Sequence, residues 1–183
     1  MPKKRSATEI LAEYAVSTCF ESYPSDVTRR AKLVIIDTIG CMLGGAATRL
    51  GRSMLETLMA SGESGTNTIV GERVRFGAAS AALLNGTNAN ALDFDETLEG
   101  IGHPSASVIP AALAVGELRS CNGKALINAV LTGYDVGNRI GKAIQPTYER
   151  LQQVWNVGTW QTMGAVAAAA RMMDLDVAQT RHA

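Results

Sequence analysis

The sequence contains few residues of the kinds that carry most protein chemistry. Among its 183 residues are three cysteines, two histidines and five prolines, and only 5% of the residues are aromatic. Cys19, Cys41 and Cys121 lie far apart, without the spacing of a metal site, which predicts reduced thiols that are buried as small hydrophobic residues. Because disulfide-bonded proteins are mostly secreted, this cysteine usage predicts a cytoplasmic protein.

An excess of charge of either sign is also missing. The 17 lysines and arginines balance the 17 aspartates and glutamates, so nothing favours nucleic acid or an acidic membrane surface as a partner. No apolar run approaches the ~20 residues that cross a bilayer, and the N-terminus lacks the apolar core of a signal peptide. With 46% hydrophobic and 19% charged residues, the composition indicates a globular chain.

Hydrophobic residues recur at helical spacing along most of the chain. The strongest apolar stripe runs from Val27 to Leu43, and Gly44-Gly45 predicts the end of that helix. Residues 66–71 have the composition of a strand, and residues 73–76 can form the second arm of a hairpin. We therefore predict an all-α fold, a helical bundle with at most one short β-hairpin.

Three further features bear on how the helices pack. Gly133, Gly137 and Gly141 are four residues apart, so they give one helix a side of small residues that another helix can approach closely. Asn85-Gly86 predicts a turn or a kink. Pro110 predicts that its helix either begins after Val108 or is kinked, because proline cannot donate to the helical ladder.

One segment stands apart from this Ala-rich background. Its acidic side chains precede the only histidine that is distant from the chain end: Asp93, Asp95, Glu96 and Glu99 before His103. On a helix, Asp93, Glu96 and Thr97 would share a face, whereas Asp93 and Asp95 would not. A carboxylate near His103 raises the pKa of an imidazole and burial lowers it, which is the kind of tuning that acid/base catalysis uses.

Pro104 predicts the start of a helix directly after this segment. The backbone N–H groups of Ser105, Ala106 and Ser107 would then be available to an anion such as a carboxylate. The residues leave three interpretations open: a polar surface loop, a metal site, or a site of proton transfer. The spacing matches no metal-ligand signature, and no GxSxG, GxGxxG or phosphate-binding loop occurs in the chain.

The run NGTNANALDFDETLEGIGHPSASVIPAALAVGE, residues 85–117, resembles the signature of the MmgE/PrpD family. That family includes 2-methylcitrate dehydratases, cis-aconitate decarboxylases and iminodisuccinate epimerases. RRAKLVIIDTIGCMLGG upstream, and GYDVGNRIGKA and GTWQTMGAVAAAARMMDLD downstream, are also similar to family motifs. The resemblance spans nearly the whole chain, from about Ala7 to His182.

The resemblance implies a helical-bundle domain whose active site lies at the junction with a second, α/β lid domain. It also implies a homodimer, no cofactor and a small di- or tricarboxylate substrate. We interpret residues 1–183 as the N-terminal helical domain, with the lid absent and the ending at Ala183 as a cut. The chain by itself is then expected to be inactive.

The site residues carried over by position are Asp93, Thr97 and His103. The resemblance implies that His103 is an acid/base or carboxylate-binding group, that Asp93 orients it or shares its proton, and that Thr97 donates a hydrogen bond to the substrate. Ser105 and Asn156 are predicted to contact the substrate. The chain departs from the family at Trp155, where many members have a second histidine; a tryptophan cannot transfer a proton.

The departure at Trp155 leaves several outcomes open: Asn156 supplies a polar contact instead, the substrate differs, or activity is lost. We predict a lyase that abstracts a proton next to a carboxylate, with dehydration of a 2-methylcitrate-like acid as the expected reaction. The alternatives are an epimerase or decarboxylase of the same family, or a non-catalytic, truncated helical module for interaction or dimerisation.

Overall fold

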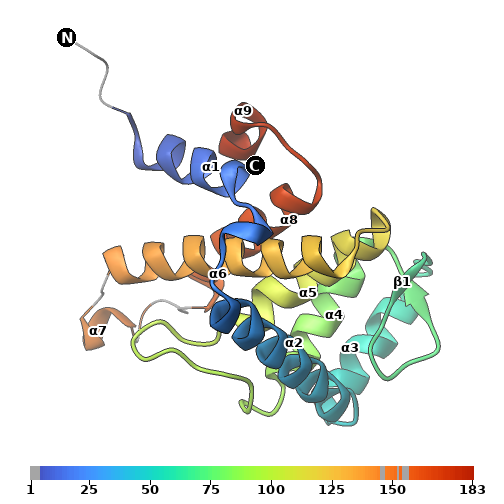
Figure 1. Ribbon diagram of the computed structural model, residues 1–183. Coiled ribbons are helices and arrows are strands. Elements are labelled where there is room, and N and C mark those ends of the chain that lie inside the picture. The colour runs from blue at the N-terminus through green and yellow to red at the C-terminus, as the bar shows by residue number, and fades with distance from the viewer. Residues whose placement is uncertain (1–4, 145–146, 152, 154–156) are drawn as a thin grey trace.

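The structure is a computed structural model that describes residues 5–144, 147–151, 153 and 157–183. It is a bundle of α-helices with one small hairpin at its edge (Figure 1). The elements in chain order are α1 (Ala7–Ser17), the 3₁₀ turn η1 (Phe20–Ser22), α2 (Ser25–Ala46), α3 (Arg49–Ala60), β1 (Asn67–Thr68), β2 (Arg75–Phe76), α4 (Ala78–Asn90), α5 (Ser105–Leu118), α6 (Gly123–Ile144), α7 (Tyr148–Leu151), the π-helical turn η2 (Val157–Gln161), α8 (Thr162–Met172) and α9 (Val177–His182).

The predicted fold class is confirmed. The apolar stripe from Val27 to Leu43 lies within the long helix α2. The two predicted arms pair as the antiparallel strands β1 and β2, with Asn67 opposite Phe76 and Thr68 opposite Arg75. The strands are shorter than the predicted segments, because only two residues of each arm pair.

Helix α5 lies at the centre of the bundle and contacts α2, α4, α6 and α8 (Figure 1). Its Val108, Ile109 and Ala112 side chains are fully buried in the main hydrophobic core. A central helix without a polar face is stable only when neighbours cover every side of it. This arrangement fixes the start of α5, where the candidate site is found.

The predicted side of small residues on α6 packs against α8. A Cβ atom added to Gly133 would lie 2.6 Å from the carbonyl oxygen of Gly164, and one added to Gly164 would lie 2.6 Å from that of Gly133. A Cβ atom added to Gly141 would likewise lie 2.9 Å from the ring of Trp160. The glycines therefore allow a helix-to-helix approach that any side chain would prevent.

The predicted turn at Asn85-Gly86 is wrong, because α4 continues through both residues. Pro110 also lies inside α5, which begins at Ser105 rather than after Val108. The two observations share a cause. Pro110 cannot donate to the carbonyl of Ala106, and a Cβ atom on Gly86 would lie only 2.8 Å from that oxygen. Gly86 thus lets α4 pack closely against α5 at the carbonyl of Ala106, which receives no helical hydrogen bond from Pro110.

Helices α2 and α3 meet at a bend of 80°. Just before the bend, Gly45 touches α4, because a Cβ atom on Gly45 would lie 1.9 Å from the backbone oxygen of Asn88. Within the described part of the chain, no single helix is long and apolar enough to cross a membrane. Helices α2 and α3, taken together as one bent pair, reach the required length and apolar composition, and only these two properties were compared.

The three cysteines lie in different environments. Cys41 is buried in α2, as predicted, and Cys121 is half-buried. Cys19 is exposed, and its thiol donates a hydrogen bond to Glu21 Oε2 over 3.1 Å. The prediction that all three are buried hydrophobic residues is therefore wrong for Cys19, which lies in the short connection between α1 and η1.

Candidate active site

The acidic loop, residues 91–104, joins α4 to α5 and is held in a defined shape. It turns back on itself where Leu98 N–H donates to the carbonyl of Gly102 over 2.9 Å. Gly100 and Gly102 adopt positive φ angles of 70° and 100° there, which glycine permits without strain. Trp160 from η2 donates its indole N–H to the carbonyl of Ile101 over 2.8 Å. The loop is therefore fastened at its far end to a distant part of the chain.

His103 lies between two carboxylates. Its Nε2 atom is 3.4 Å from Asp93 Oδ1, and its Nδ1 atom is 3.2 Å from Asp95 Oδ1. The Asp93 side chain is 83% exposed, whereas that of Asp95 is fully buried. Nδ1 is enclosed, without a well-aligned hydrogen bond to any described residue. Nε2 is thus the ring nitrogen on the solvent side, and each ring nitrogen has a carboxylate oxygen within 3.4 Å.

Buried hydrogen bonds hold Asp95 beneath the histidine. The Ser105 hydroxyl donates to Asp95 Oδ2 over 3.0 Å, and the Asn90 side-chain amide donates to Asp95 Oδ1 over 3.0 Å. Ser105 is itself fully buried at the start of α5. These donors come from the two helices that the acidic loop connects, so the position of Asp95 is set by the packing of α4 against α5.

The start of α5 receives a carboxylate from its own chain. Ser105 N–H donates to Glu96 Oε2 over 3.3 Å, while Ser107 N–H bonds to the carbonyl of Pro104. Tyr134 of α6 lies against the same Glu96 carboxyl. Burial raises the pKa of Glu96, and burial together with the nearby Glu96 charge raises the pKa of the Tyr134 phenol. The predicted anion site at this helix start is therefore occupied by Glu96.

Thr97 lies at a cavity on another side of the acidic loop. Its hydroxyl donates to the carbonyl of Gly102 over 3.4 Å. Thr97, Glu96 and Pro104 line one wall of a cavity of about 450 Å³, and α2 and α6 supply the other walls. His103 and Asp93 do not line this cavity, although His103 is adjacent in sequence to Pro104.

The family model of the MmgE/PrpD N-terminal domain matches residues 9–183. The chain belongs to the MmgE/PrpD family. It is 30% identical over 172 residues to a cis-aconitate decarboxylase of Aspergillus terreus, a match that covers 91% of this chain and 34% of that protein. It is 26% identical over 187 residues to the cis-aconitate decarboxylase of Mus musculus, a match that covers 98% of this chain and 38% of that protein.

The human cis-aconitate decarboxylase is 26% identical over 162 residues, covering 86% of this chain and 34% of that protein. The chain thus spans between 34% and 38% of the length of these curated relatives. The 26–30% identity supports membership of the MmgE/PrpD family.

The structure brings some of the predicted MmgE/PrpD site residues together and separates others. Asp93 and His103 are in contact, Thr97 faces the cavity, and Ser105 lies beneath the loop with its hydroxyl bonded to Asp95. Asn156 and the neighbouring Trp155 lie outside the described residues. Among the described residues, no group of three or more His, Cys, Asp and Glu side chains is placed to hold a metal ion.

The sequence interpretation missed the role of Asp95, Asn90 and Tyr134. On a helix Asp93 and Asp95 would not share a face, and their common contact with His103 was not predicted. In the structure α4 ends at Asn90 and Asp93 has a φ angle of 50°, so the segment is a loop in which both carboxylates reach His103. The signal that could have shown this is the Asp residue after the end of α4, since aspartate tolerates the left-handed conformation better than most residues.

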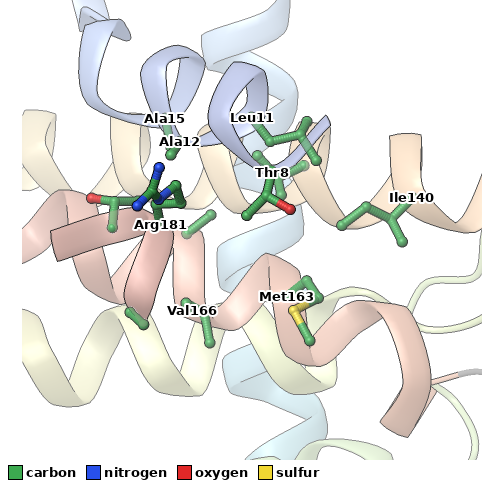
Figure 2. A pocket seen from close by; sticks show the side chains of 12 residues that line it. Thr8, Leu11, Ala12, Ala15, Ile140, Met163, Val166 and Arg181 are labelled. Atoms are coloured by element: carbon green, nitrogen blue, oxygen red, sulfur yellow. The ribbon is translucent and has the colours of Figure 1, made fainter. Parts of the chain in front are cut away.

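A second pocket lies far from the acidic loop, between α1, α6, α8 and α9 (Figure 2). It encloses about 160 Å³ and is lined mainly by apolar side chains such as Leu11, Ile140, Met163 and Val166, with Arg181 reaching in from α9. No carboxylate or imidazole side chain of the described residues lines this pocket.

Glu96→Gln is expected to change how stability depends on pH. Because the pKa of Glu96 is raised above its ordinary value of 4.5, the folded protein holds this proton more tightly than the unfolded chain. The wild-type protein should then lose stability, relative to the variant, as pH rises from about 4.5 through the raised pKa. Thermal unfolding at a series of pH values measures this. A stability difference between the two proteins that stays constant with pH would contradict it.

Proposed function

We propose that this chain forms the helical side of an active site that acts on a small di- or tricarboxylate, with His103 transferring a proton next to a carboxylate. The observation that carries the proposal is the placement of His103 between the exposed Asp93 and the buried Asp95. A histidine that is oriented by one carboxylate and open to solvent at its other nitrogen is a common arrangement for acid/base catalysis.

In this proposal the two carboxylates have different tasks. Asp95 is a positioning residue, because it is buried, bonded to Ser105 and Asn90, and holds the enclosed Nδ1 side of the ring. Asp93 lies at the exposed Nε2 side, where it can relay a proton between solvent and His103. Thr97 and the cavity next to it would contact the substrate.

Decarboxylation of an unsaturated tricarboxylate such as cis-aconitate is the reaction we favour. When the C–C bond to the departing carboxylate breaks, CO₂ leaves and the electron pair remains on carbon as a stabilised carbanion. A proton from His103 Nε2 then forms the new C–H bond, and His103 regains a proton from Asp93 or water. This step needs one proton donor, which suits a chain that has Trp155 in place of the second family histidine, and the relatives named above are cis-aconitate decarboxylases.

Dehydration of a 2-methylcitrate-like hydroxy acid is the second candidate. It requires a base that takes the C–H proton and an acid that protonates the departing hydroxide, so that water leaves and a C=C bond forms. The contact of Asp93 with His103 Nε2 favours this reading, because it places two proton-transferring groups side by side. Epimerisation would use the same pair to remove a proton and return it to the opposite face.

The test is a product assay on the full-length protein encoded by the gene. Cis-aconitate, 2-methylcitrate and iminodisuccinate are supplied separately, CO₂ release is followed, and products are identified by NMR. We expect cis-aconitate to be consumed with one CO₂ released per molecule. Loss of water from 2-methylcitrate without CO₂ would favour the dehydratase instead. A folded protein that converts none of the three would support the non-catalytic interaction module.

A further inference from the structure

We propose that the cavity between α2, α6 and the acidic loop is a subsite for one carboxylate of the substrate, with Arg30 as its cation and the Asn138 side-chain amide as a hydrogen-bond donor. This inference rests on the proposed function and names the residues of this chain that would recognise its substrate. It assigns a binding role to α2 and α6, outside the loop that carries His103.

The cavity has the character of a small-molecule site. Its volume of about 450 Å³ falls in the usual range for such sites, and most of its wall is apolar. The apolar part comes from both helices: Val27, Ala31 and Val34 of α2, and Val130 and Leu131 of α6. The polar side chains are few and line the same cavity as the apolar ones. In small-molecule sites, a few polar groups of this kind fix the orientation of the ligand.

The donors of this cavity have unused hydrogen-bonding capacity. Arg30 makes no ion pair or hydrogen bond with another described residue, although it lines this cavity and the adjoining one that contains Asp37. Asn138 uses its carbonyl oxygen to accept from Gln161 Nε2 over 3.0 Å, which leaves its NH₂ group free to donate.

The cavity is lined by charged side chains of both signs. Asp26 and Glu96 are the acidic groups among its described lining residues. Asp26 is exposed in the first turn of α2, so water screens its charge. Glu96 accepts a hydrogen bond from Ser105 N–H over 3.3 Å, so its carboxylate already has a partner at the start of α5. Arg30, which is also exposed, is the basic group among the described residues that line the cavity.

The position of the cavity connects it with His103. Thr97 and Pro104 belong both to its wall and to the acidic loop, and Pro104 directly follows His103. A ligand in the cavity therefore contacts the loop that carries the proton-transferring group. A polycarboxylate with one carboxylate at Arg30 would therefore lie against the acidic loop at Thr97 and Pro104.

The experiment is a calorimetric titration of the full-length protein with propane-1,2,3-tricarboxylate, which has no leaving group or double bond. We expect Arg30→Gln to weaken binding by about tenfold or more, because a charge-assisted hydrogen bond to a carboxylate is lost. Arg29→Gln is the matched control: Arg29 is the preceding residue of α2, is exposed and does not line the cavity. It should bind the tricarboxylate as wild type does.

Turnover gives a second measurement. Arg30→Gln should raise KM by a similar factor and change kcat much less, since the lost contact is made by ground state and transition state alike. If both arginine variants bind and turn over like wild type, the subsite is wrong and the proposed function stands. If wild type neither binds the tricarboxylate nor converts any carboxylate, the proposed function fails and the subsite fails with it.

Discussion

His103→Ala is expected to lower kcat of the full-length protein by about a hundredfold or more, the usual contribution of a general acid/base group. Asp93→Asn is expected to have an effect of the same size, because it removes the carboxylate beside His103 Nε2. Asparagine is the appropriate replacement, since it also tolerates the positive φ angle of 50° at this position. A loss of turnover would then report chemistry rather than a distorted loop.

Steady-state kinetics on the preferred carboxylate measures this effect, with thermal unfolding to show that each variant is folded. His182→Ala provides the matched control, because His182 is exposed in the last turn of α9 and is remote from the acidic loop in sequence. Its turnover should equal that of wild type. If His103→Ala and Asp93→Asn both retain near-normal turnover, the site assignment is wrong.

Gly45→Ala should cause the largest loss of stability among the simple substitutions in this chain. The new methyl group would lie 1.9 Å from the backbone oxygen of Asn88, far inside van der Waals contact. The obstacle is backbone of α4 rather than a flexible side chain, so α2 and α4 would have to separate. We expect the free energy of unfolding to fall by about 3 kcal/mol, the upper part of the range for overpacked cores.

Gly40→Ala is the control for that measurement. Gly40 lies in the same helix, α2, and a Cβ atom there would meet nothing within 4 Å. Because alanine is a better helix former than glycine, this variant should gain about 0.5–1 kcal/mol. Chemical denaturation compares the two proteins directly. Equal stabilities for the two variants would show that α2 does not pack on α4 as described.

The helices could be predicted from the sequence because their apolar residues repeat at helical spacing, as from Val27 to Leu43. The continuation of α4 through Asn85-Gly86 could not be predicted in the same way. Its local composition favours a turn, but Gly86 is needed for the approach of α4 to the carbonyl that Pro110 leaves open in α5. A contact between two helices therefore overrides a local preference, and the sequence of one segment does not reveal it.

The candidate site was predictable to the extent that its residues share one short motif. Asp93, Thr97 and His103 could be named from the family resemblance, and Asp93 and His103 are in contact. Asp95 could not be paired with His103, because the left-handed residue that redirects the loop was not foreseen. Tyr134 belongs to a different helix, and only the packing of α6 against the loop brings it to Glu96.

The hydrogen bond from Trp160 to Ile101 has a consequence for exchanging parts between family members. Transplanting residues 91–104 into a related protein would transfer His103 and its neighbouring carboxylates. It would not transfer Trp160, the hydrogen-bond donor that holds the loop, which lies about sixty positions later in the chain. The transferable unit is therefore discontinuous. The acidic loop and residues 157–161 should therefore be exchanged together.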